Sequence, residues 1–291
     1  AAAACLLAAE FQLSKGQNTT AISLYDAVRT AQVPEPMRLA ALRGAIVARG
    51  PAGVELLVKS IRSEERAIRN TALLTAREIP SERLAHALEA ELPTARPELQ
   101  AQLLEALADY PNPQSIQIVR AHASSDHPLV RQAALKVLGK RGTPTDAPLL
   151  LAAIVEPRGV EEASAAAASL ARIEGAEVDR LIIGKLESAA NPNIRIALID
   201  LLDARSPAAA TAELLRQAAA PEPQVSLAAY RAIRSLAGRE QLPALIELTK
   251  SCQDGPRRAA AETALFYAAT RQSADAAAGE MLLAELRKSM S

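Results

Sequence analysis

The sequence predicts an all-α fold, a solenoid of about eight stacked helix pairs with a half-repeat at each end. The main observation is a short phrase, an aliphatic residue followed by an Ala-rich apolar stretch, that recurs every 31 or 32 residues. Its aliphatic position is occupied by Met37, Ile68, Leu99, Val130, Ile194 and Val225, and the 64 residues from 130 to 194 leave room for two units. A fixed period in this range indicates units that bury their apolar faces only against neighbouring units.

Composition supports this fold class and excludes others. Hydrophobic residues make up 49% of the chain and aromatic residues only 2%, so Ala, Leu, Ile and Val must form a core of closely packed helices. Lys plus Arg and Asp plus Glu both number 33, a balance that argues against a protein built mainly to hold polyanions. The sequence contains no uncharged apolar run long enough to span a membrane.

Each period divides into a first helix with apolar residues at helical spacing and a second helix that opens with the phrase. Residues that cap or break helices separate the two. The predicted pairs are 19–32 with 35–49, 52–62 with 65–79, 81–92 with 97–109, 113–124 with 127–140, 144–155 with 159–173, 176–189 with 192–204, 207–219 with 222–237, and 240–252 with 256–271.

Half-units remain at both ends, a second-type helix over 2–14 and a first-type helix over 274–289. Complete arrays normally close with polar-faced capping units, so we interpret the chain as a fragment of a longer protein. We predict one array over 1–291. It consists of a variant, tetratricopeptide-like first turn over 1–34, the repeats proper over 35–271 and a terminal half-repeat over 272–291.

The clearest copy of the phrase, Asp-His-Pro-Leu-Val-Arg-Gln-Ala-Ala-Leu-Lys-Val-Leu-Gly from Asp126 to Gly139, resembles the second half of a HEAT repeat. It is closest to the short bacterial form related to phycobilisome-lyase units. The resemblance implies a right-handed α-α superhelix whose second helices line the concave side, and it implies binding and not chemistry. The stretch 16–53 is also similar to HEAT arrays of large bacterial proteins, which implies an exported or periplasmic location.

In that family, Asp and Arg residues of neighbouring units commonly form a ladder along the array. Gln100 and Ser226 stand where an arginine is expected and interrupt the series. We interpret the matching arginines as structural residues that hold adjacent turns together, and the alternative is a basic stripe that faces a ligand. The matching residues are Arg38, Arg69, Asp126, Arg131 and Arg195.

Residues able to carry chemistry are few. His122 and His127 flank Asp126, but their spacing matches no familiar metal motif, so we expect capping and solvated roles. A nucleophilic thiol needs a base within hydrogen-bond reach, and neither Cys5 nor Cys252 has a histidine nearby in the sequence. We therefore expect no catalytic residue, no metal site and no cofactor.

The leading hypothesis is a non-catalytic scaffold, favoured as a monomer, whose extended concave surface binds a protein, a peptide or another domain of the same polypeptide. Alternatives are a nucleic-acid-binding protein of the DNA glycosylase type and a chromophore-lyase-like protein. The zero net charge and the absence of Trp count against nucleic acid as a partner. The predicted binding residues are exposed positions on the second helices, namely Arg43, Arg49, Glu105, Lys136, Lys140, Arg231 and Arg234.

Overall fold

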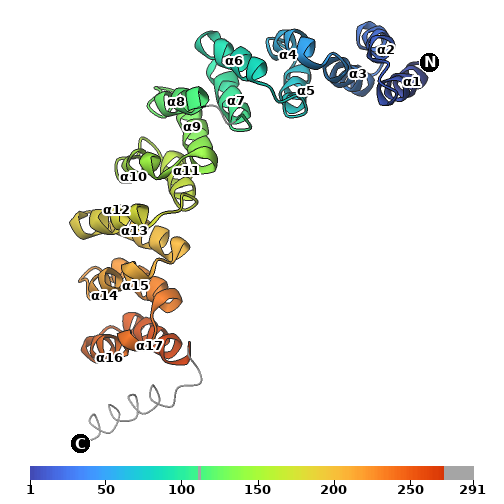
Figure 1. Ribbon diagram of the computed structural model, residues 1–291. Coiled ribbons are helices and arrows are strands. Elements are labelled where there is room, and N and C mark those ends of the chain that lie inside the picture. Colours follow the sequence, from blue (N-terminus) through green and yellow to red (C-terminus); the bar gives the residue numbers. More distant parts are fainter. Residues whose placement is uncertain (111–112, 272–291) are drawn as a thin grey trace, which may run out of the picture. The chain divides into compact units, whose positions relative to one another are not determined.

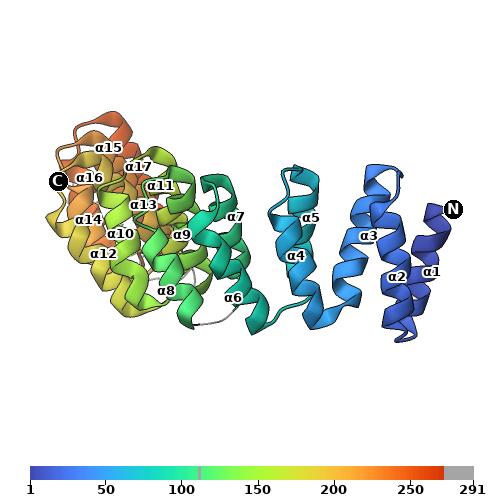
Figure 2. The same ribbon diagram turned by 90° about the horizontal axis from the view of Figure 1, so that it is seen from above.

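In a computed structural model the chain is described over residues 1–110 and 113–271. This part of the chain consists of α-helices, short 3₁₀ turns and connecting loops, without a β-strand (Figure 1). The helices fall into two compact units, Ala1–Arg141 and Gly142–Ser291. Figures 1 and 2 show the two helices of each pair lying side by side, so the predicted all-α solenoid class is confirmed.

The first unit opens with α1 (Ala2–Ser14), the predicted N-terminal half-repeat. Second helices pack on second helices, α3 on α5 and α7 on α9, while α4 packs on α6. Four pairs follow α1: α2 (Asn18–Thr30) with α3 (Glu35–Ala48), α4 (Gly53–Ile61) with α5 (Arg66–Ala76), α6 (Glu82–Glu91) with α7 (Pro97–Leu107), and α8 (Pro113–His122) with α9 (Pro128–Arg141).

The second unit repeats this plan, with α13 packed on α15 and α15 on α17. The half-repeat predicted over 272–291 lies outside the described residues. The unit has four pairs in its described part: α10 (Ala147–Val155) with α11 (Val160–Leu170), α12 (Ala176–Ser188) with α13 (Pro192–Arg205), α14 (Thr211–Ala218) with α15 (Pro223–Leu236), and α16 (Leu242–Ser251) with α17 (Gly255–Thr270).

Helix starts follow local chemistry. Proline occupies the first turn of most second helices, where its missing N–H costs no hydrogen bond. Asn191 caps α13 by accepting from the N–H of Asn193 at 2.9 Å. Several first helices begin one to four residues later than the sequence predicts because a 3₁₀ turn precedes them. These turns are η1 (Gly50–Ala52), η3 (Pro144–Asp146), η4 (Ala208–Ala210) and η5 (Arg239–Gln241).

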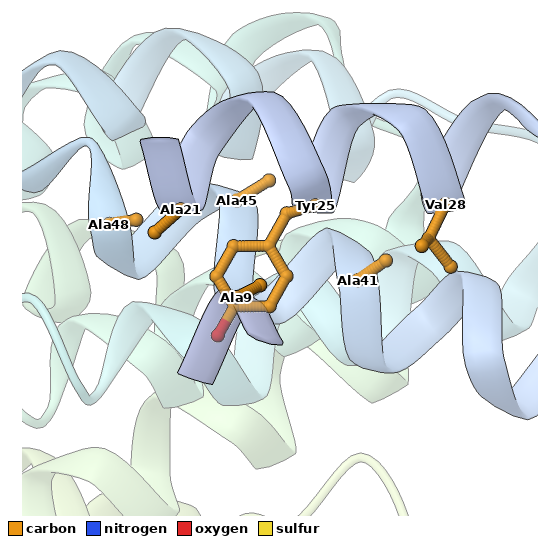
Figure 3. Close-up of a cluster of buried hydrophobic side chains, with 7 residues drawn as sticks. All are labelled: Ala9, Ala21, Tyr25, Val28, Ala41, Ala45 and Ala48. Carbon is orange, nitrogen blue, oxygen red and sulfur yellow. The ribbon is translucent and has the colours of Figure 1, made fainter. Parts of the chain in front are cut away.

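The core is aliphatic, apart from a few buried tyrosines. Tyr25 is fully buried among alanines of α1, α2 and α3 (Figure 3). Its ring fits because Gly44 lacks a side chain: a Cβ there would lie 2.3 Å from Tyr25 Cε1. Burial and the neighbouring Glu10 raise the pKa of the Tyr25 hydroxyl. The Tyr25 ring thus depends on the absence of a side chain at Gly44.

A second tyrosine joins two adjacent pairs. The Tyr110 hydroxyl, just after α7, donates to the carbonyl of Ala76 at the end of α5, with an O···O distance of 2.6 Å. Burial raises the pKa of Tyr110 to about 12, and the nearby Asp109 adds to the effect. This hydrogen bond fixes α7 against the preceding second helix.

Candidate functional site

One register of the second helices is exposed in every repeat that carries the phrase. It lies six residues after the aliphatic position, and we call its members the second-helix stripe: Arg43, Leu74, Glu105 and Lys136 in the first unit, and Asp200 and Arg231 in the second. The residue that follows each stripe position is buried. The repeat therefore holds the backbone in place and presents the stripe side chain of each of these pairs to solvent, with a chemistry that changes between neighbouring pairs of a unit.

Ion pairs between repeats flank the stripe in the first unit. Arg43 binds Glu78 through two parallel contacts, Nε to Oε1 at 2.7 Å and Nη2 to Oε2 at 2.6 Å. Arg77 Nε binds Asp109 Oδ2 at 2.7 Å. Because these groups are well exposed, each pair contributes at most about 1 kcal/mol, and its main effect is to orient the side chains.

In the second unit, two stripe residues face each other. Arg231 Nη2 lies 3.6 Å from Asp200 Oδ1. Burial raises the pKa of the Asp200 carboxyl, an effect that Arg231 partly opposes. Arg43, Arg77 and Arg231, which do not belong to the predicted arginine series, thus form ion pairs between neighbouring repeats on the exposed face of the second helices.

A groove of about 270 Å³ lies along the stripe between α5 and α7. Leu74 is 63% exposed beside it and presents an apolar surface to solvent. The amides of Gln102 and Asn70 are 3.5 Å apart, with Nε2 of Gln102 pointing to Oδ1 of Asn70. Each amide keeps further donor or acceptor capacity. The lining consists of Asn70, Leu73, Leu74, Arg77, Gln102, Glu105 and Ala106.

The predicted binding residues divide into two groups. Arg49 is held inside the first repeat, because Nη2 binds Asp26 Oδ2 at 2.5 Å and Nη1 donates to the carbonyl of Ala45 at 2.8 Å. Burial opposes ionisation of Asp26, but hydrogen bonds from Arg49 and Arg29 outweigh it and lower the pKa of this carboxyl. This pairing removes Arg49 from the residues available to a partner.

The other predicted binding residues are exposed on second helices. Four of them, Arg43, Glu105, Lys136 and Arg231, are stripe residues. Lys140 lies one turn further along α9. The Arg234 guanidinium lies 5.4 Å from the centroid of the Tyr267 ring, a cation–π contact between α15 and α17.

The predicted arginine series acts mainly within its own repeat. Arg131, only 4% exposed, donates to the carbonyls of Ser125 and Asp126 at 2.8 and 3.0 Å. In the same way, Arg69 donates to the carbonyls of Ser63 and Glu64. These bonds join the loop between the two helices of a pair to the second helix. The bonds of Arg69 therefore lie within one repeat and not between neighbouring turns.

Gln100 and Ser226 continue this series. Gln100 Nε2 donates to the carbonyl of Leu92 at 2.9 Å, and Ser226 Oγ donates to the carbonyl of Ala218 at 2.7 Å. Both acceptors lie at the end of the preceding first helix. The side chain at this register thus donates to a backbone carbonyl before the second helix, whether it is Arg, Gln or Ser.

Two members of the series differ. Arg195 Nε donates to Gln217 Oε1 at 2.7 Å, and its Nη1 lies 3.0 Å from Glu222 Oε2, so it does connect α13 with the next pair. Arg38 lines a cleft instead. In the described part of the chain its guanidinium has neither a hydrogen-bond partner nor an ion-pair partner.

The remaining polar candidates lie apart. His122 Nδ1 donates to the carbonyl of Ile118 at 2.8 Å, and His127 is exposed. Among the residues described, no three His, Cys, Asp or Glu side chains are grouped to hold a metal ion. Cys5 packs against the first core cluster, and Cys252 is also a free thiol. None of the helices within 1–110 and 113–271 is both long and apolar enough to cross a membrane.

Stacked helix pairs that repeat along the chain define an α-solenoid of the helical repeat class. The family model for HEAT repeats matches residues 85–171 and 180–265, more than half of the chain. The chain therefore belongs to the HEAT repeat family.

Solved structures with the same fold include two karyopherins. Kap95p, from a structure of its complex with RanGDP, has a TM-score of 0.61 at 16% identity, covering 93% of this chain and 42% of Kap95p. Kap121p bound to Pho4p has a TM-score of 0.58 at 12% identity, covering 92% of this chain and 40% of Kap121p. The chain spans about two fifths of either karyopherin, and at these identities the likeness shows the fold alone.

A weaker likeness is to human deoxyhypusine hydroxylase, with a TM-score of 0.39 and 16% identity over 88% of this chain and 98% of that one. A search among curated proteins found no match.

Proposed function

We propose that the chain is a non-catalytic scaffold that binds a protein or peptide along the exposed face of its second helices. The observation that carries this proposal is the second-helix stripe. Its backbone and flanking residues repeat, whereas its exposed side chains change from Arg43 to Leu74, Glu105 and Lys136. A surface built this way recognises a partner by a sequence of side chains, as repeat arrays do through their extended surfaces.

The groove between α5 and α7 supports a peptide as the bound element. The amides of Asn70 and Gln102 are able to hydrogen-bond a backbone amide of any sequence. Leu74 offers an apolar contact beside them, and Glu105 sets a charge preference. Burial of an exposed leucine on binding contributes roughly 2 kcal/mol, enough to make it a central contact.

The charge pattern favours a protein over nucleic acid. In the first unit, Glu105 lies between Leu74 and Lys136 along the stripe, and Arg43 is already neutralised by Glu78. Phosphate binding requires a continuous basic surface, which this sequence of charges does not provide. The karyopherin of similar fold whose structure is described as bound to Pho4p has a protein as its partner, which is consistent with the proposal.

The test uses a displayed library of random peptides as the probe. Peptides enriched on the wild-type chain are synthesised, and their dissociation constants are measured by fluorescence anisotropy. Leu74→Ser is expected to weaken binding by about tenfold or more through loss of the apolar contact. The matched control is Gln117→Ser on α8, an exposed first-helix residue outside the stripe and the groove.

Retained affinity in the Gln117→Ser variant and loss in Leu74→Ser would support the second-helix face as the binding surface. Equal affinity of both variants for every selected peptide would overturn it. Because Leu74 is exposed, its replacement by a polar residue leaves the core intact, which circular dichroism verifies.

A further inference from the structure

A second recognition feature lies between the first two helix pairs of the first unit. It is a cleft of about 200 Å³ bounded by α2, α3, α4 and α5. Its lining includes no residue of the second-helix stripe. Four aliphatic side chains and four charged ones line the cleft: Leu39, Leu42, Leu56 and Ile68, with Arg29, Arg38, Lys59 and Glu65.

Arg38 lies at the register where Arg69 and Arg131 bind loop carbonyls, but here it has no such role. The carbonyls at the equivalent positions before Arg38 are those of Gln32 and Val33. Neither accepts a hydrogen bond from the Arg38 guanidinium. The guanidinium, with five N–H donors, is left to face the cleft.

The charges around the cleft favour an anion. Within residues 1–110 and 113–271, the Lys59 ammonium has no hydrogen-bond or ion-pair partner, and it lines the same cleft as Arg38. Arg29 is neutralised by Asp26, with Nε 2.6 Å from Oδ1. The only carboxylate in the lining is that of Glu65. Two uncompensated cations against one carboxylate attract a carboxylate ligand, and the guanidinium offers it two parallel hydrogen bonds.

We propose that this cleft binds a segment of a protein partner in which an aliphatic side chain lies next to an Asp or Glu. The aliphatic side chain packs on Leu39, Leu56 and Ile68, and the carboxylate binds Arg38 and Lys59. A volume of about 200 Å³ accommodates one such side chain and excludes a folded element. The site is separate from the second-helix face, so it stands whether or not that face binds a peptide.

The test uses a short fluorescein-labelled peptide, blocked at both ends, with a Ser-Asp-Leu-Asp-Ser core. Two matched peptides replace Asp with Asn or Leu with Ser. Anisotropy titrations compare the wild-type chain with Arg38→Glu/Lys59→Glu and with Lys15→Glu/Arg96→Glu, two exposed positions outside the cleft and the stripe. Both double variants change the net charge by the same amount within the same unit, so they separate a local site from a general charge effect.

We expect the Arg38→Glu/Lys59→Glu variant to bind the acidic peptide at least about tenfold more weakly, and the Lys15→Glu/Arg96→Glu variant to bind as the wild type does. Each matched peptide should also lose affinity for the wild type. Absence of wild-type binding, equal loss in both double variants, or equal affinity for the Asn peptide would overturn the proposal. If the first variant fails to fold, Arg38→Gln/Lys59→Gln replaces it with the same expected direction.

Discussion

The first and fourth helix pairs of the first unit share a register but use it differently. In the fourth pair, Arg131 is buried and bonded to its loop, and Val137 fills the core. In the first pair, Arg38 faces a cleft, and Gly44, at the register of Val137, leaves room for the Tyr25 ring. The repeat thus fixes where a residue lies on its helix, while the neighbouring loop and the opposite side chain decide what it does.

The largest loss of stability is expected at the contact between Gly44 and the Tyr25 ring in the first helix pair. Gly44→Ala would place a Cβ 2.3 Å from the Tyr25 ring, so the buried ring or the helix must shift. We expect a loss of about 3 kcal/mol in the free energy of unfolding. Urea denaturation measures the loss, and hydrogen exchange should place it in α2 and α3. The double variant Tyr25→Leu/Gly44→Ala should recover part of the loss.

The control for this prediction is Gly184→Ala on α12, where a Cβ would meet no atom within 4 Å. Since alanine favours helix more than glycine does, this variant should gain up to about 1 kcal/mol. A change of the same sign in both variants would contradict the packing explanation.

A smaller loss is expected in the fourth pair. Arg131→Met keeps the apolar stem but removes both bonds to the carbonyls of Ser125 and Asp126. We expect a loss of about 2 kcal/mol, because hydrogen bonds from charged groups are stronger than neutral ones. Urea denaturation measures the loss in the free energy of unfolding. Faster hydrogen exchange of the amides at the start of α9 would assign this loss to the fourth helix pair. Unchanged exchange there would show that the loop does not depend on Arg131.

Ser226 extends the comparison to a shorter side chain at the same register. Ser226→Ala leaves the buried carbonyl of Ala218 without this donor, and a loss of about 1 kcal/mol in unfolding free energy is expected. Thermal unfolding followed by circular dichroism measures it. Ser226→Thr, which keeps the hydroxyl, is the matched control, and a similar loss in both variants would point to packing instead.

The smallest effect is expected for Arg38→Met in the first pair. Its guanidinium has no bond to a loop carbonyl, so the free energy of unfolding should change by less than about 0.5 kcal/mol. The same denaturation assay applies to it and to Arg131→Met. A loss equal to that of Arg131→Met would show that Arg38 also stabilises its loop, and the contrast between the two pairs would fail.

Most of the fold was predictable from the sequence, but the site was predictable only in part. The predicted helix pairs match those observed to within a few residues, except where 3₁₀ turns delay a first helix. Glu105 and Lys136 were identified as exposed because they are charged. Leu74 was missed because an apolar residue in an Ala-rich helix is normally expected to be buried. Its spacing of one repeat from both Arg43 and Glu105 was the signal that placed it at an exposed position.

The ion pairs between neighbouring repeats were also predictable from the sequence only in part. Arg43 with Glu78 and Arg77 with Asp109 pair across 35 and 32 residues, close to one period. Opposite charges at that separation were visible in the sequence. Which of them meet depends on the rotation of one helix against the next, and side-chain packing sets that rotation.

The sequence by itself determined the period, the helix pairs and the solenoid class, since these follow from the local spacing of apolar residues along the chain. The tertiary structure alone decided the roles at the arginine register. Arg69 and Arg131 donate to loop carbonyls, and Gln100 and Ser226 donate to carbonyls at the end of the preceding first helix, while Arg38 lines a cleft without such a bond. A side chain can bind only the acceptors within its reach, and only the folded backbone sets which acceptors those are.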